Sequence, residues 1–186
     1  DNTYKIAKEE GAQVYISYNQ GRAIQMNFGA WYAKNNILYF LHADSFPPLN
    51  FDKKIIKAVE DGHKGGCFRM TFNDDHWLLK CSCWFTRLKW NICNGGDQSL
   101  FVKRELFEKI KGYKESLSIF EDIDIIQKLK KRVDFYVIPS YITTSARRYR
   151  KNGVVKLQLL FALLHLFYFI GLSHEFIFNF YKNKIR

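Results

Sequence analysis

The stretch ILYFLHADSFPP, residues 37–48, decides the fold. Its first five residues are apolar or aromatic without interruption, which is typical of a strand buried on both faces of a sheet. The strand then runs into His42 and Asp44, and two prolines make the following turn rigid. Ligands of open α/β sheets bind at the carboxyl ends of strands, so we expect this strand to end at the rim of a site.

Outward from this strand, strand-like and helical segments alternate along the chain. The predicted strands are 14–17, 37–41, 67–72, 99–103, 134–139 and 142–145. The predicted helices are 3–10, 21–34, 51–62, 77–90, 104–110 and 121–132. This alternation favours an α/β fold with a mostly parallel sheet flanked by helices.

The C-terminal part has a different composition. Residues 157–172, LQLLFALLHLFYFIGL, contain no Lys, Arg, Asp or Glu and follow the basic run ARRYRK at 146–151. The run is shorter than the about 20 apolar residues that span a bilayer. A basic cluster before an apolar helix fits peripheral contact of 146–172 with an anionic membrane surface. A helix packed on the domain, or on a second subunit of a homodimer, is equally open. A second helix is predicted over 174–182.

Composition and charge limit the classes of partner. The chain has 186 residues, 47% hydrophobic, which suits one folded domain rather than a disordered chain. Its 29 Lys and Arg against 18 Asp and Glu give a net charge of +11. This charge favours phosphate-bearing ligands or an anionic membrane surface. No recognisable nucleic-acid motif is present, so no nucleic acid is expected as a partner. No apolar leader is visible near the start, and we expect a cytoplasmic location.

The four cysteines are expected to be free thiols. The spacing of Cys81 and Cys83, with His76 before and Cys93 after, fits no common structural zinc pattern. Buried thiols, Cys67 among them, are therefore favoured over a zinc site. A reducing compartment agrees with this prediction.

Two acidic positions have residue types suited to chemistry. Asp44 follows a buried strand, where a carboxylate can bind Mg²⁺ together with substrate phosphates, or simply cap the loop. Glu121 and Asp122 open a predicted helix. Acids there complement the helix dipole, but the same position also holds a carboxylate rigidly, as a general base requires.

Two glycine-containing segments are further candidates. In NGGDQ, residues 94–98, glycines allow close backbone approach, and Asp97 and Gln98 offer groups suited to hydroxyls. An ordinary glycine turn is the alternative. Gly21 and Arg22 open another helix, whose N-terminus with an arginine suits a phosphate, unless Arg22 is only a surface residue.

Together these segments resemble the family 2 glycosyltransferases of the GT-A fold, and in particular a bacterial subgroup of them. The motifs are collinear over nearly the whole chain: GRAIQMNFGA at 21–30, FLHAD at 40–44, GGCFR at 65–69, GDQSLFV at 96–102, ED at 121–122 and TSARR at 144–148. The resemblance implies a GT-A-like domain over 1–150, followed by an apolar and amphipathic helical segment over 151–186.

The resemblance also implies a function. It is the transfer of a sugar from a nucleotide-diphosphate sugar to a hydroxyl of a lipid, glycan or small molecule, with inversion and with Mg²⁺ or Mn²⁺. The enzyme would lie in the cytoplasm, at the inner face of the membrane where peripheral contact occurs. The implied catalytic residues are Asp122 as base with Glu121 beside it. The implied donor-binding residues are Arg22, Gln25, His42, Asp44, Arg147 and Arg148, with Asp44 as metal ligand. The implied acceptor-binding residues are Gly96, Asp97 and Gln98.

The chain departs from the family pattern in two ways. His42 replaces the first acid of the family's DxD motif, which removes one negative charge near the metal. The strand, helix and strand that bind the nucleotide in this family would precede Asp1. These departures favour an alternative, a catalytically degenerate module that binds a membrane or a partner.

Overall fold

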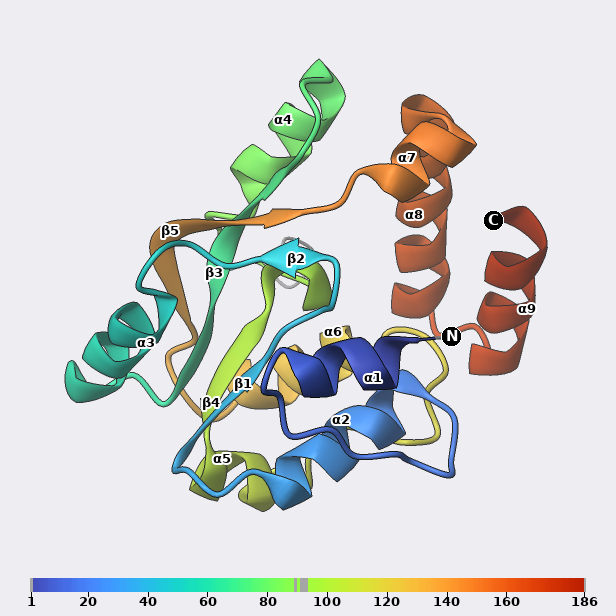
Figure 1. The fold of residues 1–186 in the computed structure, drawn as a ribbon. Coiled ribbons are helices and arrows are strands. Elements are labelled where there is room, and N and C mark those ends of the chain that lie inside the picture. The colour runs from blue at the N-terminus through green and yellow to red at the C-terminus, as the bar shows by residue number, and fades with distance from the viewer. Residues whose placement is uncertain (1, 89, 91–93, 186) are drawn as a thin grey trace.

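A five-stranded mixed sheet forms the centre of the molecule (Figure 1). The computed structural model describes residues 2–88, 90 and 94–185. In spatial order the strands are β1 (Ile37–Phe40), β4 (Leu100–Lys103), β3 (Gly65–Phe72), β5 (Tyr136–Thr144) and β2 (Ser45–Phe46). Strand β1 is an edge strand, and its polar continuation from His42 leads into the short β2 on the opposite edge.

The prediction of a mostly parallel sheet is wrong. Among the described strands β3 and β5 are parallel, whereas the β1–β4, β3–β4 and β2–β5 pairs are antiparallel. The physical reason is the position of helix α4 (Trp77–Phe85), which continues beyond the end of β3 instead of covering the sheet (Figure 1). The chain therefore re-enters the sheet from the end at which it left, and β4 runs antiparallel to β3.

The two strands predicted over 134–139 and 142–145 form one strand. The register between β3 and β5 shifts after Phe68, which pairs with Ile138, while Arg69 pairs with Tyr141. The two extra residues of β5 are Pro139 and Ser140, and proline has no N–H to donate to a ladder. A bulge thus separates two halves of one continuous β5.

Helices cover both faces of the sheet. The remaining helices are α1 (Thr3–Glu9), α2 (Arg22–Tyr32), α3 (Phe51–Glu60), α5 (Arg104–Lys109), α6 (Glu121–Lys130), α7 (Arg147–Asn152), α8 (Val154–Phe169) and α9 (His174–Lys184), with a 3₁₀ turn, η2, at Gly96–Gln98. One core lies under α2, α5 and α6 and takes Cys67, Leu100 and Val102 from the sheet. The other lies under α3 and takes Phe68 and Phe101. Neighbouring residues face opposite cores, as the pleat requires.

Two local predictions differ from the structure. Residues 14–17 form no strand, and the ring of Tyr15 stacks on Tyr32 of α2 with centroids 3.9 Å apart. Helix α4 ends at Phe85 rather than at 90, because buried Thr86 caps it by donating to the Cys83 carbonyl at 2.6 Å. Cys93, part of the cysteine prediction, lies outside the described residues.

Gly66 of the GGCFR segment has a packing role. A Cβ atom at this position would lie 2.0 Å from the Tyr136 carbonyl oxygen and 2.7 Å from the Phe101 ring. Strands β4 and β5 approach β3 on both sides at this point, so only glycine fits without a backbone shift.

The C-terminal helices form a separate small core against the loop before α6. Leu157 and Leu164 of α8 and Ile177 of α9 are fully buried together with Phe120. Among the described residues, no helix has both the length and the hydropathy needed to cross a membrane.

Candidate functional site

A chain of polar contacts joins four segments that are far apart in the sequence. The loop after β1 contributes His42, the first residue of α2 contributes Arg22, η2 contributes Asp97, and the first residue of α6 contributes Glu121. These segments meet at the end of the sheet where β1 ends and β4 begins. The edge expected to carry a site from the sequence is therefore where the polar residues collect.

His42 lies at the centre of this chain. Its Nε2 is 2.8 Å from Arg22 Nη2, and its Nδ1 is 3.2 Å from Asp97 Oδ1. A guanidinium group can only donate, so Nε2 accepts and the ring proton lies on Nδ1, directed at Asp97. Both ring nitrogens are thus engaged, and His42 presents no free lone pair to a metal ion.

Glu121 anchors the other side of Arg22. The Nε atom of Arg22 lies 3.1 Å from Glu121 Oε1, and Glu121 is only 1% exposed. Burial raises the pKa of Glu121, and the neighbouring charge of Asp122 adds to this, while Arg22 partly offsets both. The sequence predicts Glu121 beside the base; the structure gives it an ion pair that orients Arg22.

Asp97 contacts His42 and keeps 61% of its side-chain surface open. Its partly enclosed position acts to raise its pKa, but the hydrogen bond from His42 and the positive charges of Arg22 and Arg148 outweigh this effect. The pKa of Asp97 is therefore lowered and the carboxylate is ionised. Arg148, a predicted donor residue on α7, thus acts on the same cleft as Arg22.

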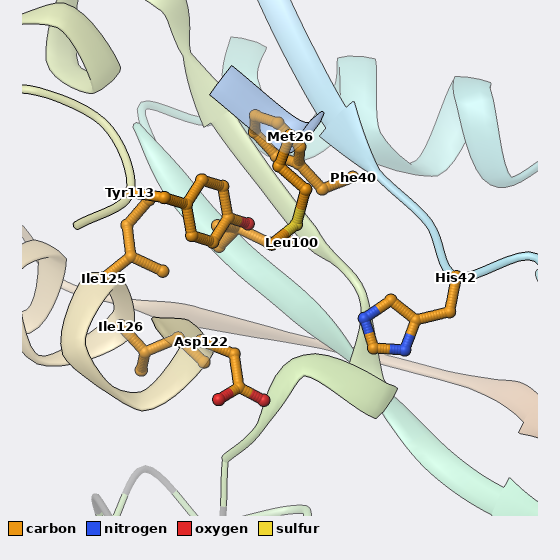
Figure 2. A pocket seen from close by; sticks show the side chains of 8 residues that line it. All are labelled: Met26, Phe40, His42, Leu100, Tyr113, Asp122, Ile125 and Ile126. Carbon is orange, nitrogen blue, oxygen red and sulfur yellow. The ribbon is translucent and has the colours of Figure 1, made fainter. Parts of the chain in front are cut away.

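Asp122 borders a narrow cavity together with His42 (Figure 2). Its Oδ1 accepts a hydrogen bond from the Ile123 N–H at 2.8 Å, which fixes the carboxylate at the start of α6. A Cβ placed on Gly95 would be 3.8 Å from Asp122 Oδ2, so the glycine loop lies directly against this carboxylate. The predicted base and the predicted acceptor loop are therefore neighbours.

Tyr113 and Asn27 belong to this region, but the sequence reasoning did not single them out. Tyr113 lines the same cavity, and burial together with the charges of Asp122 and Glu121 raises its pKa (Figure 2). Asn27 holds its backbone, with both Asn27 Nδ2 to the Tyr113 carbonyl and the Tyr113 N–H to Asn27 Oδ1 at 2.9 Å. The Asn of the GRAIQMNFGA segment was the signal available for this contact.

Gln98 is held by the protein itself. Its Nε2 donates to the carbonyls of Phe68 (3.2 Å) and Thr86 (3.1 Å), and its Oε1 accepts from Asn94 Nδ2 (3.3 Å) and from the Gly95 N–H (3.1 Å). It is 2% exposed. Gln98 thus fixes the loop that carries Asp97, and Gly96 is the first residue of the η2 turn.

The predicted metal ligand Asp44 is exposed. It lies in the turn before β2, and the pairing of Ser45 with Thr144 puts it opposite the start of the TSARR segment. Among the described residues no group of three or more His, Cys, Asp or Glu side chains could hold a metal ion. One open carboxylate does suit a cation that brings substrate phosphates as its other ligands.

A second hollow runs along β1. It measures about 540 Å³ and lies between α2 and the outer edge of β1, with Gln25 and Arg22 at its wall and His42 at its end. Gln25 is exposed and faces this groove. Arg147 is exposed at the start of α7, on the TSARR side of the site.

The comparisons with known proteins agree with this arrangement. The sequence model described as "Glycosyl transferase family 2" matches residues 1–146, about four-fifths of the chain. No curated protein matches the chain. The match includes α2, the end of β1, η2 and α6, which supply Arg22, His42, Asp97, Glu121 and Asp122, whereas Arg147 and Arg148 lie beyond it. Because the match extends over most of its length, the chain belongs to glycosyl transferase family 2.

Proposed function

We propose that the chain transfers a sugar from a nucleotide-diphosphate sugar to an acceptor hydroxyl, with inversion and with Asp122 as the general base. Membership of the family supports glycosyl transfer in general. The proposal that Asp122 is the base rests on one observation: Asp122 and His42, 80 positions apart in the sequence, line the same cavity. A base must lie close to the proton that it removes, and the hydrogen bond from the Ile123 N–H fixes this carboxylate at the edge of the cavity.

On the donor side, Arg22, Arg147 and Arg148 supply positive charge for the diphosphate. Arg22 is oriented by Glu121 and His42 before any ligand binds, so its guanidinium needs little reordering. Gln25 lies one helical turn further along the same groove. Asp44 would hold Mg²⁺ or Mn²⁺ against the diphosphate, and the cation would neutralise charge on the leaving group.

We expect the acceptor beside Asp97 and the backbone of Gly96, because their loop lies against Asp122 at Gly95. The ionised Asp97 accepts a hydrogen bond from an acceptor hydroxyl, and Gln98 contributes by holding the loop in place. In the transfer, Asp122 takes the proton of the attacking acceptor hydroxyl, and the oxygen of that hydroxyl bonds to the anomeric carbon. The bond from that carbon to the diphosphate breaks, and the nucleoside diphosphate leaves with the electron pair.

In this proposal residues 1–150 form the catalytic domain and residues 151–186 form a C-terminal helical segment. We also propose that the enzyme works in the cytoplasm, at the inner face of the membrane. The family match ends at residue 146, close to the proposed boundary. The second candidate function is a catalytically degenerate module that binds a membrane or a partner. It is favoured by His42, because both of its ring nitrogens are engaged by Arg22 and Asp97 and neither is open to a metal ion.

The test compares Asp122→Asn with Asp124→Asn. Asp124 lies on the same helix but pairs with Lys128 at 2.8 Å, so it is a matched control for charge and position. Nucleoside diphosphate release is measured over a panel of nucleotide sugars with Mn²⁺. We expect Asp122→Asn to lose about 10²–10⁴-fold in rate and Asp124→Asn to keep it.

Two outcomes would contradict the proposal. Full activity of a folded Asp122→Asn variant would remove Asp122 from the base role. The degenerate module predicts instead that the unaltered chain shows no turnover and no thermal shift with nucleoside diphosphates and Mn²⁺.

A further inference from the structure

Helix α8 exposes a long apolar stripe. Val155, Leu159, Leu166, Phe169 and Ile170 are each between 48% and 66% exposed. Their spacing of three, four and seven residues puts them on one side of the helix, opposite the buried Leu157 and Leu164. The helix is thus apolar on both sides, and only one side is covered by the described residues.

Helix α4 extends this stripe with aromatic side chains. Trp77 is 69% exposed and Trp84 53%, with Phe85 beside them at 42%. Gln158 Nε2 of α8 donates to Ser82 Oγ of α4 at 2.7 Å, so the two helices are in contact.

Both helices bury their opposite sides in clusters that share Tyr149 of α7. The two helices therefore border one shared layer of buried side chains. We call these eight residues the α4–α8 face: Trp77, Trp84, Phe85, Val155, Leu159, Leu166, Phe169 and Ile170.

Basic residues predominate around the α4–α8 face. Residues 135–174 contain no Asp or Glu, but they contain five basic residues at 147, 148, 150, 151 and 156. All five are exposed and lie on α7 or the first turn of α8. Two acids, Asp74 and Asp75, lie just before α4, and each is paired: Asp74 Oδ2 is 3.2 Å from Arg150 Nη1, and Asp75 Oδ1 is 2.7 Å from Lys80 Nζ. A partner that fits this surface is apolar and bears negative charge beside its apolar part.

We propose that the α4–α8 face docks on an anionic membrane surface, with α8 lying in the interface. No described helix is long and apolar enough to cross a bilayer, which argues for lying on it. Exposed tryptophans suit the headgroup level of a bilayer. A second copy of the chain fits less well, because it would bring a surplus of cations to a surface where cations already predominate. The proposal does not depend on the proposed sugar transfer.

Binding to vesicles tests the proposal with the full chain. Phosphatidylcholine vesicles with and without phosphatidylglycerol are sedimented with the protein, and the bound fraction gives the partition coefficient. We expect binding only to the anionic vesicles, weakening as salt is added. The double variant Leu159→Gln/Leu166→Gln should lose about ten-fold per leucine, since each leucine leaves the apolar phase. Lys151→Gln/Lys156→Gln should lose roughly five-fold per lysine.

Leu49→Gln is the matched control, because Leu49 is 86% exposed but lies in the turn before α3, away from this face. Equal vesicle binding by Leu159→Gln/Leu166→Gln and by Leu49→Gln would overturn the proposal, as would no binding of the unaltered chain. Light scattering without lipid adds a further outcome. A dimer that the leucine double variant dissociates would identify a second copy as the occupant and also overturn it.

Discussion

The replacement Gln98→Ala separates a binding role of this residue from a structural one. The GDQ motif implies that Gln98 contacts the acceptor. In the structure its amide makes four hydrogen bonds to the chain itself, and 2% of the residue is exposed. If those bonds hold the loop, the loss of Gln98 affects stability first and activity only through the loop.

The expected magnitude follows from the bonds that are lost. Each hydrogen bond contributes about 1 kcal/mol net, and a buried group left unpaired costs about 1–3 kcal/mol. The carbonyls of Phe68 and Thr86 lie inside the fold and lose a donor, while the Gly95 N–H loses an acceptor. We expect Gln98→Ala to lower the free energy of unfolding by about 3–4 kcal/mol, a large share of the about 5–15 kcal/mol of an ordinary domain.

Urea unfolding at neutral pH measures this loss. Gln20→Ala, which removes the same side chain at an exposed position, serves as the control and should change stability by no more than about 0.5 kcal/mol. Gln98→Glu keeps the volume but turns a carboxylate toward two carbonyl oxygens, so it should be destabilised at pH 7 and partly recover in acid. If Gln98→Ala unfolds like the unaltered chain and only its acceptor KM rises, the structural account is refuted.

Three further predictions concern packing, titration and thiol chemistry. Gly66→Ala should cost at least about 1–3 kcal/mol in urea unfolding because a backbone carbonyl blocks the new methyl group, and an unchanged midpoint would contradict the close strand approach. Burial raises the folded-state pKa of Glu121 above its unfolded value, so its contribution to stability is full in acid and declines as pH rises through the folded pKa. Glu121→Gln should therefore flatten the fall in stability above about pH 4.5, and curves that stay parallel to those of the unaltered chain would refute this. Exposed Cys81 should be alkylated in the native protein, whereas Cys67, whose pKa burial raises to about 12, should react only after unfolding, as peptide mapping would show.

Strong local patterns in the sequence predicted the elements that position the site. The apolar run before His42 is a strand, and the segment with acids at its start and bases at its end is helix α6. Both signals come from the chain's own side chains, through burial and through the helix dipole. The same local signals brought Asp122 and the glycine loop forward as candidates, and the fold makes them neighbours.

The parts that failed depend on partners distant in the sequence. Residues 14–17 have the composition of a strand, but no described strand pairs with them, and Tyr15 packs on a helix instead. Strand direction was missed because a helix that extends past the sheet has the same sequence pattern as one that covers it. The role of Gln98 was missed because four hydrogen bonds to three segments decide it, and two of these segments are distant in the sequence.

His42 stands where the resemblance predicts an acid, and the carboxylate of Asp97 lies next to its ring. A neutral imidazole at this position lacks the negative charge of the family's first acid, but its Nδ1 proton is directed at the ionised Asp97 from the η2 turn. Asp97, 55 positions later in the sequence, thus places a carboxylate beside the ring at the end of β1. An aspartate in place of His42 would face Asp97 with like charge, which raises the pKa of one of the two acids. His42 and Asp97 are therefore best understood as one unit whose members depend on each other, and a sequence motif read at position 42 alone understates the negative charge in the cleft.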